Sequence, residues 1–190
     1  MNKYIEIKVI PAARLTLGDK KAIRDLCTGA FGEDVWCDYG YLNSAFHIVG
    51  LLGEQIVSHA LWTDRLLSVA GHVPLNTAYV EYVATEPSLQ GQGLASQLLR
   101  FLVDYIQDEH ALRAQLKING PYQLAALAPE DSEFYQRLGW ELWLGDLFIR
   151  QDGGNIATPE DDVMVYRLSR TPKFVVTEDL SAEWREGEWW

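Results

Sequence analysis

Two glycines separated by one residue lie at an expected strand-to-helix junction, in VATEPSLQGQGLASQLL at residues 83–99. The residues before them read as a strand, and from Gly91 onward apolar residues recur at helical spacing. A helix N-terminus has unpaired N–H groups and a partial positive charge, so it can bind a phosphate that comes close. Glycine lacks the Cβ that would block this approach. The stretch Gln90 to Ala95 therefore favours a pyrophosphate-binding turn, although a tight turn alone explains a pair of glycines equally well.

Two other phosphate motifs do not fit these residues. A nucleotide P-loop needs a Lys and a Ser or Thr after its second glycine. A dinucleotide-binding fingerprint needs a third glycine and an acidic residue about 20 positions further on, within a βαβ unit. Neither pattern is present, and the strands before the turn read as antiparallel hairpins.

The rest of the chain predicts a mixture of strands and helices. The runs at 46–53, 55–69 and 76–85 indicate three consecutive antiparallel strands. Residues 31–46 lack a clear period and read as a loop that can contain a short helix, and 151–162 read as a polar loop. Further strands are expected at 4–10, 122–128, 140–150 and 163–169, and helices at 16–30, 91–106 and 129–139.

Composition restricts the class of protein and its partners. A chain of 190 residues, 48% hydrophobic, predicts a single domain over residues 1–190. It has no run of 18 apolar residues and no visible secretory signal, so the expected location is cytoplasmic. The net charge of −11, without basic blocks, argues against nucleic acid and membranes as partners and suits a cationic ligand. Acidic residues that only keep the protein soluble would give the same charge.

Cysteine and histidine show no metal-binding spacing. The two cysteines, Cys27 and Cys37, do not form a CxxC pair, and the four histidines are scattered. We therefore predict neither a metal site nor a disulfide framework.

The glycine turn resembles motif A of the Gcn5-related N-acetyltransferases, the GNAT superfamily, whose Q/R-x-x-G-x-G/A core is similar to QGQGLA. The resemblance implies an α+β fold with a mixed, mostly antiparallel central sheet flanked by helices, in which splayed strands form the acetyl-CoA cleft. It implies that the coenzyme A pyrophosphate lies on the turn, and that the main chain of Val83 and Thr85 hydrogen-bonds the pantetheine chain. The residues of the turn assigned to the cofactor are Gln90, Gly91, Gln92, Gly93, Leu94 and Ala95.

A narrower resemblance covers nearly the whole chain. YVEYVA, FYQRLGW, TPEDD and the ending AEWREGEWW are similar, in this order, to stretches of the aminoglycoside 2′-N-acetyltransferases. This implies transfer of acetyl from acetyl-CoA to the 2′-amine of an aminoglycoside, hence antibiotic resistance, and a homodimer. The chain departs from these relatives at YLNSAFH, in two shortened loops and at Ala128, and these departures concern drug selectivity.

Two residues are expected to move protons. Acetyl transfer needs a neutral amine, and Glu81 is the only acid in a strand that is otherwise apolar or small, with Tyr79 and Val83 on the same face by β alternation. An exposed strand carboxylate is the alternative for Glu81. Tyr135 matches the tyrosine that returns a proton to the departing thiolate in the family. The alternative for Tyr135, packing in the core of a helix, has equal weight from sequence alone.

Carboxylates around the pocket are expected to bind the cationic substrate. The resemblance assigns this role to Asp34, Asp38, Glu81 and Asp161, with Glu188 in place of the family's tail aspartate and the carboxylate of Trp190 as a further ligand. Surface charge is the alternative for Asp161, which lies in an acidic run. The tail, about 178–190, either docks on the body of the protein, folding back to the substrate site, or is an interaction tail.

Three functions are therefore compatible with the sequence. The first is an aminoglycoside 2′-N-acetyltransferase. The second is an acetyltransferase of the same fold that acts on another cationic amine, such as a polyamine or an endogenous amino sugar. The third is a non-catalytic acyl-CoA-binding module, which the presence of both Glu81 and Tyr135 disfavours.

Overall fold

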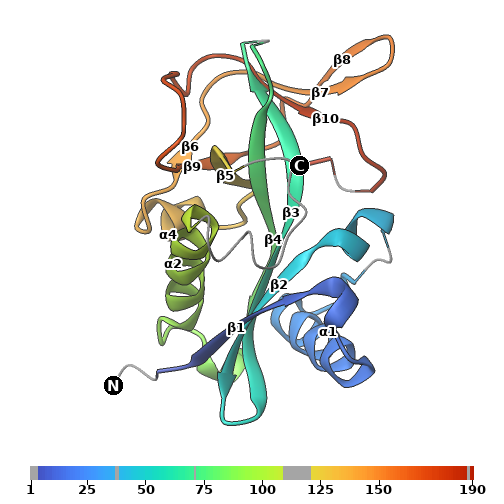
Figure 1. Ribbon diagram of the computed structural model, residues 1–190, viewed down its shortest axis with the longest axis vertical. Helices are drawn as coiled ribbons and strands as arrows, with labels where there is room; N and C mark the ends of the chain where they lie inside the picture. Colours follow the sequence, from blue (N-terminus) through green and yellow to red (C-terminus); the bar gives the residue numbers. More distant parts are fainter. Residues whose placement is uncertain (1–3, 37–38, 71, 109–120, 188) are drawn as a thin grey trace. The chain divides into compact units, whose positions relative to one another are not determined.

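The computed structural model describes residues 4–36, 39–70, 72–108, 121–187 and 189–190 (Figure 1). Contacts divide the chain into two compact units, here called unit 1 (Met1–Thr63 and Val80–Tyr105) and unit 2 (Asp64–Tyr79 and Ile106–Trp190). Strands β3 (Gln55–Val69) and β4 (Leu75–Thr85) contribute residues to both units. Among the described helices, none is long and apolar enough to cross a membrane.

The strands of unit 1 pair in sequence order. β1 (Glu6–Pro11) is antiparallel to β2 (Phe46–Leu52), and β2 is antiparallel to the first part of β3. β4 follows β3 in the sheet order, and just after β4 the amide of Glu86 donates to the carbonyl of Val57 at 2.9 Å. The hairpins expected before the glycine turn are thus confirmed.

Helix α1 (Leu17–Phe31) covers one face of the unit 1 strands. It begins with a capping box in which Thr16 and Asp19 satisfy each other's backbone N–H groups, and it ends at Gly32 in the left-handed conformation. Its buried residues Ile23, Leu26 and Cys27 pack with Val49 and Ala84.

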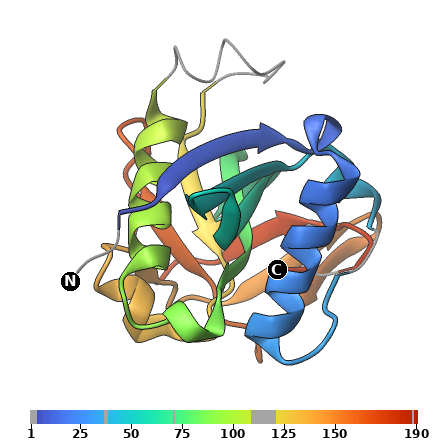
Figure 2. The same cartoon turned by 90° about the horizontal axis from the view of Figure 1, so that it is seen from below.

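Helix α2 (Leu94–Gln107) covers the opposite face, as Figure 2 shows. Gly50 follows Val49 along β2 and so faces away from α1; a Cβ there would lie 3.5 Å from Leu98 of α2. The sequence predicted a helix from Gly91, but α2 begins at Leu94. Gly91 and Gly93 have φ values of 72° and 79°, which no right-handed helix accepts.

Unit 2 contains a mixed sheet in the order β6-β9-β5-β4-β3-β10-β7-β8. β4 with β5 and β10 with β7 are parallel pairs, whereas the other pairs described in this unit are antiparallel. Together with the antiparallel strands of unit 1, this confirms the expected α+β class with a mixed, mostly antiparallel sheet. The elements not yet bounded are β5 (Leu124–Leu127), α4 (Ser132–Gln136), β6 (Glu141–Leu142), β7 (Leu147–Gln151), β8 (Gly154–Ala157), β9 (Met164–Arg167) and β10 (Leu180–Glu183).

Two expectations for unit 2 were wrong. The run 140–150 is not one strand but two, β6 and β7, separated by a turn at Gly145, where a Cβ would lie 2.0 Å from the carbonyl oxygen of Glu178. Residues 151–162 are not entirely a loop, because β7 and β8 form a hairpin whose turn uses Gly153 at φ 99°. The exposed β8 has few apolar residues, so the alternating pattern that identifies a half-buried strand is missing.

The C-terminal tail docks within unit 2. Part of it forms β10, which pairs with both β3 and β7. Trp190 is only 7% exposed, packs in the core of unit 2, and donates from Nε1 to Oγ1 of Thr158 at 2.8 Å. The tail is therefore docked on unit 2, and its folding back to a substrate site stays a prediction.

Candidate active site

The glycine turn connects β4 to α2 in unit 1. Both glycines have positive φ, and a Cβ built on either one would meet no heavy atom within 4 Å. Gln90 closes the turn by donating from Nε2 to the carbonyl of Thr85 at 3.2 Å. The glycines therefore serve the backbone conformation and also leave open space beside the first turn of α2.

Glu81 lies on β4 in unit 1 and is partly buried. Its Oε1 accepts a hydrogen bond from the hydroxyl of Tyr41 at 3.3 Å, and its Oε2 accepts one from Thr63 Oγ1 at 3.3 Å. Tyr41 lies on the short helix η2 (Gly40–Ser44) and stacks on Tyr39 with ring centroids 5.6 Å apart. Glu81 is therefore held by two hydroxyl groups, which an exposed strand carboxylate would not need.

Tyr82, the next residue, leaves the extended conformation. Its φ is 53°, a left-handed value that is uncommon for any residue except glycine. The regular alternation expected along β4 is thus interrupted between Glu81 and Val83. Tyr82 packs against Trp36 with ring centroids 5.1 Å apart.

A buried histidine pair lies beside this break. Nδ1 of His59 is 3.0 Å from the carbonyl oxygen of Tyr82, and Nε2 of His59 is 3.0 Å from Nδ1 of His47. Burial lowers the pKa of His47 to about 4 and that of His59 to about 3, so both rings are neutral at pH 7. The nearby thiol of Cys27, 3.9 Å from His59 Nδ1, has its pKa raised by burial to about 12 and is unreactive.

Tyr41, Thr63 and the histidine pair were not predicted from the sequence. A signal existed in β3, where the polar residues Ser58, His59 and Thr63 interrupt a buried strand. Buried polar side chains need partners, so their presence indicates a neighbour that uses them. No sequence spacing connects residue 41 with residue 81.

Asp34, expected to bind the substrate, is engaged elsewhere in unit 1. It forms an ion pair with Arg24, whose Nε lies 3.1 Å from Oδ1, and the hydrogen bond from Arg24 lowers the pKa of this carboxyl. The side chain of Asp34 is about half exposed. Asp38 lies outside the described residues.

Tyr135 lies on α4 in unit 2, where Asp131 caps the helix by accepting from the amide of Phe134 at 3.1 Å. Its ring is 9% exposed and meets Trp140 edge to face. Burial raises the pKa of Tyr135 to about 12, and the charges of Glu130 and Asp131 act in the same direction. Tyr135 therefore keeps its proton at neutral pH, while its burial also makes it part of the core.

In unit 2, Asp161 and Trp190 of the tail both form a hydrogen bond with Thr158. The amide of Asp161 donates to the carbonyl of Thr158 at 3.2 Å, and Trp190 bonds to the hydroxyl of the same threonine. Asp161 itself is exposed, and Glu188 lies outside the described residues.

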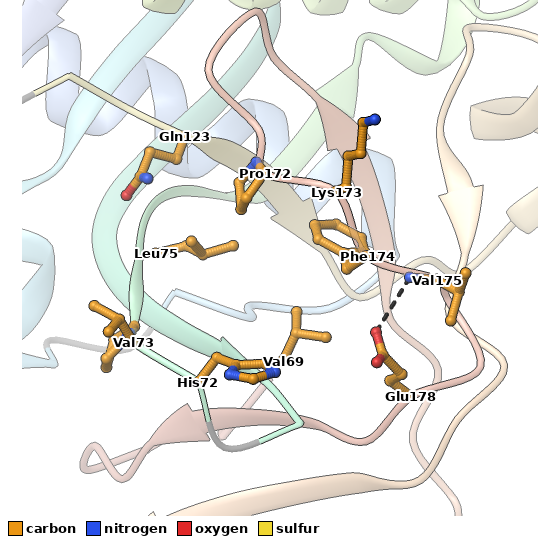
Figure 3. Close-up of a pocket in the computed structure, with 11 residues that line it drawn as sticks. Val69, His72, Val73, Leu75, Gln123, Pro172, Lys173, Phe174, Val175 and Glu178 are labelled. Carbon is orange, nitrogen blue, oxygen red and sulfur yellow. Dashed lines mark hydrogen bonds between the residues drawn. The ribbon is translucent and has the colours of Figure 1, made fainter.

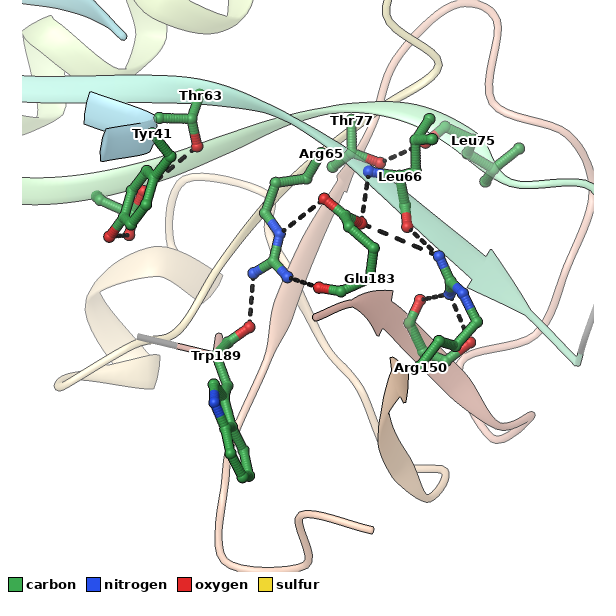
Figure 4. A network of polar contacts seen from close by, with 11 residues as sticks. Tyr41, Thr63, Arg65, Leu66, Leu75, Thr77, Arg150, Glu183 and Trp189 are labelled. Atoms are coloured by element: carbon green, nitrogen blue, oxygen red, sulfur yellow. Dashed lines mark hydrogen bonds and ion pairs between the residues drawn. The ribbon is translucent and has the colours of Figure 1, made fainter. Parts of the chain in front are cut away.

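Arg65 fixes the end of the tail in unit 2. Its side chain is 1% exposed and donates to the carbonyls of Trp189 at 2.6 Å and Glu183 at 2.7 Å, as Figure 4 shows. A buried guanidinium needs such partners, so the tail and Arg65 stabilise each other.

A pocket of about 640 Å³ in unit 2 is shown in Figure 3. It is lined mostly by apolar side chains from the β3–β4 connection and from residues 172–175. None of the residues predicted for the active site lines it. Among the described residues, no group of three or more His, Cys, Asp or Glu side chains could hold a metal ion.

Comparison with known sequences identifies the family. The sequence model of the acetyltransferase (GNAT) domain matches residues 14–143. The chain belongs to the GNAT acetyltransferase family. An aminoglycoside 2′-N-acetyltransferase of Mycolicibacterium fortuitum is 31% identical to it over 179 residues, which cover 91% of this chain and 84% of that relative.

Solved structures confirm the GNAT fold. YhbS of Escherichia coli, a GNAT N-acetyltransferase in complex with CoA, gives a TM-score of 0.60 at 20% identity, over 96% of this chain and 91% of YhbS. ElaA of Escherichia coli gives 0.55 at 16% identity, over 86% and 99%. A structure from Enterococcus faecalis described as a probable N-acyltransferase gives 0.55 at 20% identity, over 74% of this chain. The GNAT chain described here spans only about a third (33%) of that protein. Family and fold together make the chain an acetyl-CoA-dependent N-acetyltransferase.

The neutral histidine pair predicts a pH-dependent stability for this GNAT protein. An unfolded histidine titrates near 6.5, and folded His47 has a pKa of about 4, so its contribution is full above about pH 6.5 and is lost as the pH falls through the folded value. Between pH 7 and pH 5 the free energy of unfolding should fall by about 2 kcal/mol less in His47→Phe than in the unsubstituted protein. Urea unfolding at both pH values measures this difference. An equal fall in the free energy of unfolding of the two proteins would mean that folded His47 binds a proton between pH 7 and pH 5 as an unfolded histidine does.

Proposed function

We propose that the protein transfers the acetyl group of acetyl-CoA to the 2′-amine of an aminoglycoside and thereby confers resistance to such antibiotics. The extent of the similarity to the Mycolicibacterium fortuitum enzyme carries the proposal. That alignment leaves 9% of the chain unmatched, whereas the GNAT domain model ends at residue 143 of 190. Most of the region beyond the general GNAT domain is therefore similar to an aminoglycoside 2′-N-acetyltransferase.

The glycine turn is the proposed site for the pyrophosphate of acetyl-CoA. The open space beside Gly91 and Gly93 exposes the first amides of α2, whose N–H groups and helix dipole attract phosphate. The main chain of Val83 and Thr85 would hydrogen-bond the pantetheine chain. The other contacts come from Gln90, Gln92, Leu94 and Ala95.

Glu81 and Tyr135 are the proposed proton-transfer residues. The neutral amine attacks the thioester carbonyl carbon, the carbon–sulfur bond breaks, and the coenzyme A sulfur leaves. Glu81 receives the proton that the amine loses, through a water molecule, and Tyr135 supplies the proton that the sulfur gains. The hydroxyls of Tyr41 and Thr63 support the role of Glu81 because they hold a carboxylate in one orientation.

Carboxylates are proposed to bind the cationic substrate. The candidates are Asp34, Asp38, Glu81, Asp161, Glu188 and the end of the chain at Trp190. The ion pair of Asp34 with Arg24 must open, or share the substrate's ammonium group, for Asp34 to take part. The expected homodimer and cytoplasmic location stay predictions.

A matched pair of substrates tests the proposed function. An aminoglycoside with a 2′-amine and an analogue with a 2′-hydroxyl are incubated with acetyl-CoA, and release of free thiol is followed. We expect turnover of the amine alone, with NMR placing the acetyl group on the 2′-nitrogen. Acetylation at another position, or turnover of a polyamine or simple amino sugar in preference to every aminoglycoside, would contradict the substrate assignment.

The cofactor site predicts different results for two similar glycines. Gly91 and Gly53 have φ values of 72° and 62°, and neither has a heavy atom within 4 Å of its ideal Cβ position. Gly91→Ala and Gly53→Ala should therefore strain the backbone to a similar degree. We expect Gly91→Ala alone to weaken coenzyme A binding, by about tenfold or more, which corresponds to loss of one good contact. If calorimetry gives the two variants the same affinity for coenzyme A, the cofactor does not bind at the glycine turn.

Replacing the proposed proton-transfer groups should slow turnover. Glu81→Gln and Tyr135→Phe are each expected to lower kcat by roughly 100- to 10,000-fold, the usual contribution of a general acid or base. Two control variants make the same chemical changes elsewhere. They are Glu86→Gln, just after β4, and Tyr122→Phe, at another buried tyrosine of unit 2. Their kcat should stay within about threefold of the unsubstituted value. If a control variant loses as much activity as the matching variant at Glu81 or Tyr135, the proton-transfer role of that residue is wrong.

A further inference from the structure

The carbonyl of Tyr82 accepts a hydrogen bond from a buried side chain of β3. Because Tyr82 has a φ of 53°, its peptide groups are turned away from the directions of an extended strand. Such a conformation costs about 1–3 kcal/mol and persists only where the surroundings determine it.

His59 donates this hydrogen bond. Its side chain is fully buried, and its Nδ1 lies 3.0 Å from the carbonyl oxygen of Tyr82. A carbonyl only accepts, so Nδ1 of His59 carries the hydrogen and, in the neutral ring, Nε2 is the acceptor. His47 then donates from its Nδ1 to His59 Nε2, over 3.0 Å. The two neutral rings form a chain of donors that ends at Tyr82.

The neighbouring part of β4 is also held from β3. Ser58, next to His59, donates to the carbonyl of Ala84 at 3.2 Å, and its hydroxyl lies 3.1 Å from that of Thr85. Adjacent residues of β3 thus engage the carbonyls on both sides of Val83. On the other side of the break, Thr63 of β3 holds the carboxylate of Glu81.

We infer that His59 is a positioning residue for the reaction: it holds the break in β4 at Tyr82 and thereby sets the direction of Glu81. The inference rests on the proposed function in that Glu81 is taken as the base. His59 touches neither the reacting atoms nor the glycine turn. Its loss should therefore lower kcat by a larger factor than coenzyme A affinity, because the glycine turn keeps its own contacts.

Three variants of His59 test this role. Asn carries an amide nitrogen on Cγ, where His59 carries Nδ1, so His59→Asn can still donate to Tyr82. His59→Leu has nearly the shape of Asn without the donor. His59→Gln has the same amide group one carbon further out. His47→Phe removes the second imidazole and keeps a ring near Trp36.

We expect kcat to fall on the order of tenfold or more in His59→Leu and His59→Gln, and to stay within about threefold in His59→Asn and His47→Phe. Calorimetry should give all four a coenzyme A affinity within about threefold of that of the unsubstituted protein. Amide hydrogen exchange of residues 81–85 should speed up only in the Leu and Gln variants.

Equal kcat in His59→Leu and the unsubstituted protein would overturn the inference. Equal loss in His59→Asn and His59→Gln would overturn it too, and this comparison needs only polar replacements if the Leu variant does not fold. A wrong proposed function would give a different result from a wrong role of His59. The unsubstituted protein would then acetylate no amine, while the exchange rates of residues 81–85 would still show whether His59 holds β4.

Discussion

Strand β4 leaves the extended conformation at Tyr82, and the polar interior of unit 1 is built around this break. Ser58, His59 and Thr63 of β3 are buried, and each one contacts β4. Buried polar groups in an apolar strand destabilise the fold unless they are paired, so these contacts depend on one another. The break separates Glu81 from Val83 and leads on to the glycine turn, which places the proposed base and the proposed cofactor contacts on one short segment.

The buried histidines of unit 1 are neutral, although the chain as a whole is strongly acidic. The net charge of −11 belongs to the chain as a whole, whereas the buried histidines of unit 1 are neutral. A neutral pair can hold a carbonyl without attracting the anionic cofactor or repelling a cationic substrate. In unit 2 the buried charge of Arg65 is matched by carbonyls and by Glu183, and it fixes the docked tail.

The sequence predicted what local patterns encode. The glycine turn, the amphipathic α2 and the alternating strands follow from residue type and spacing, and the family followed from motifs in the right order. The 151–162 hairpin was missed because its second strand is exposed and has few apolar residues. Tyr41 was missed because only tertiary structure brings η2 to Glu81, and the ion pair of Asp34 with Arg24 is equally invisible in the chain order. A positive φ at Tyr82 has no sequence signal, since tyrosine rarely adopts it.

Binding of coenzyme A along the end of β4 and the start of α2 can be measured by titrating it into ¹⁵N-labelled protein and following each backbone amide by NMR. We expect the largest shifts at Val83, Gly91, Gly93 and Leu94, because these amides would donate to the pantetheine chain and the pyrophosphate. Saturable binding that leaves these four amides unshifted, with the changes concentrated elsewhere in the chain, would contradict it.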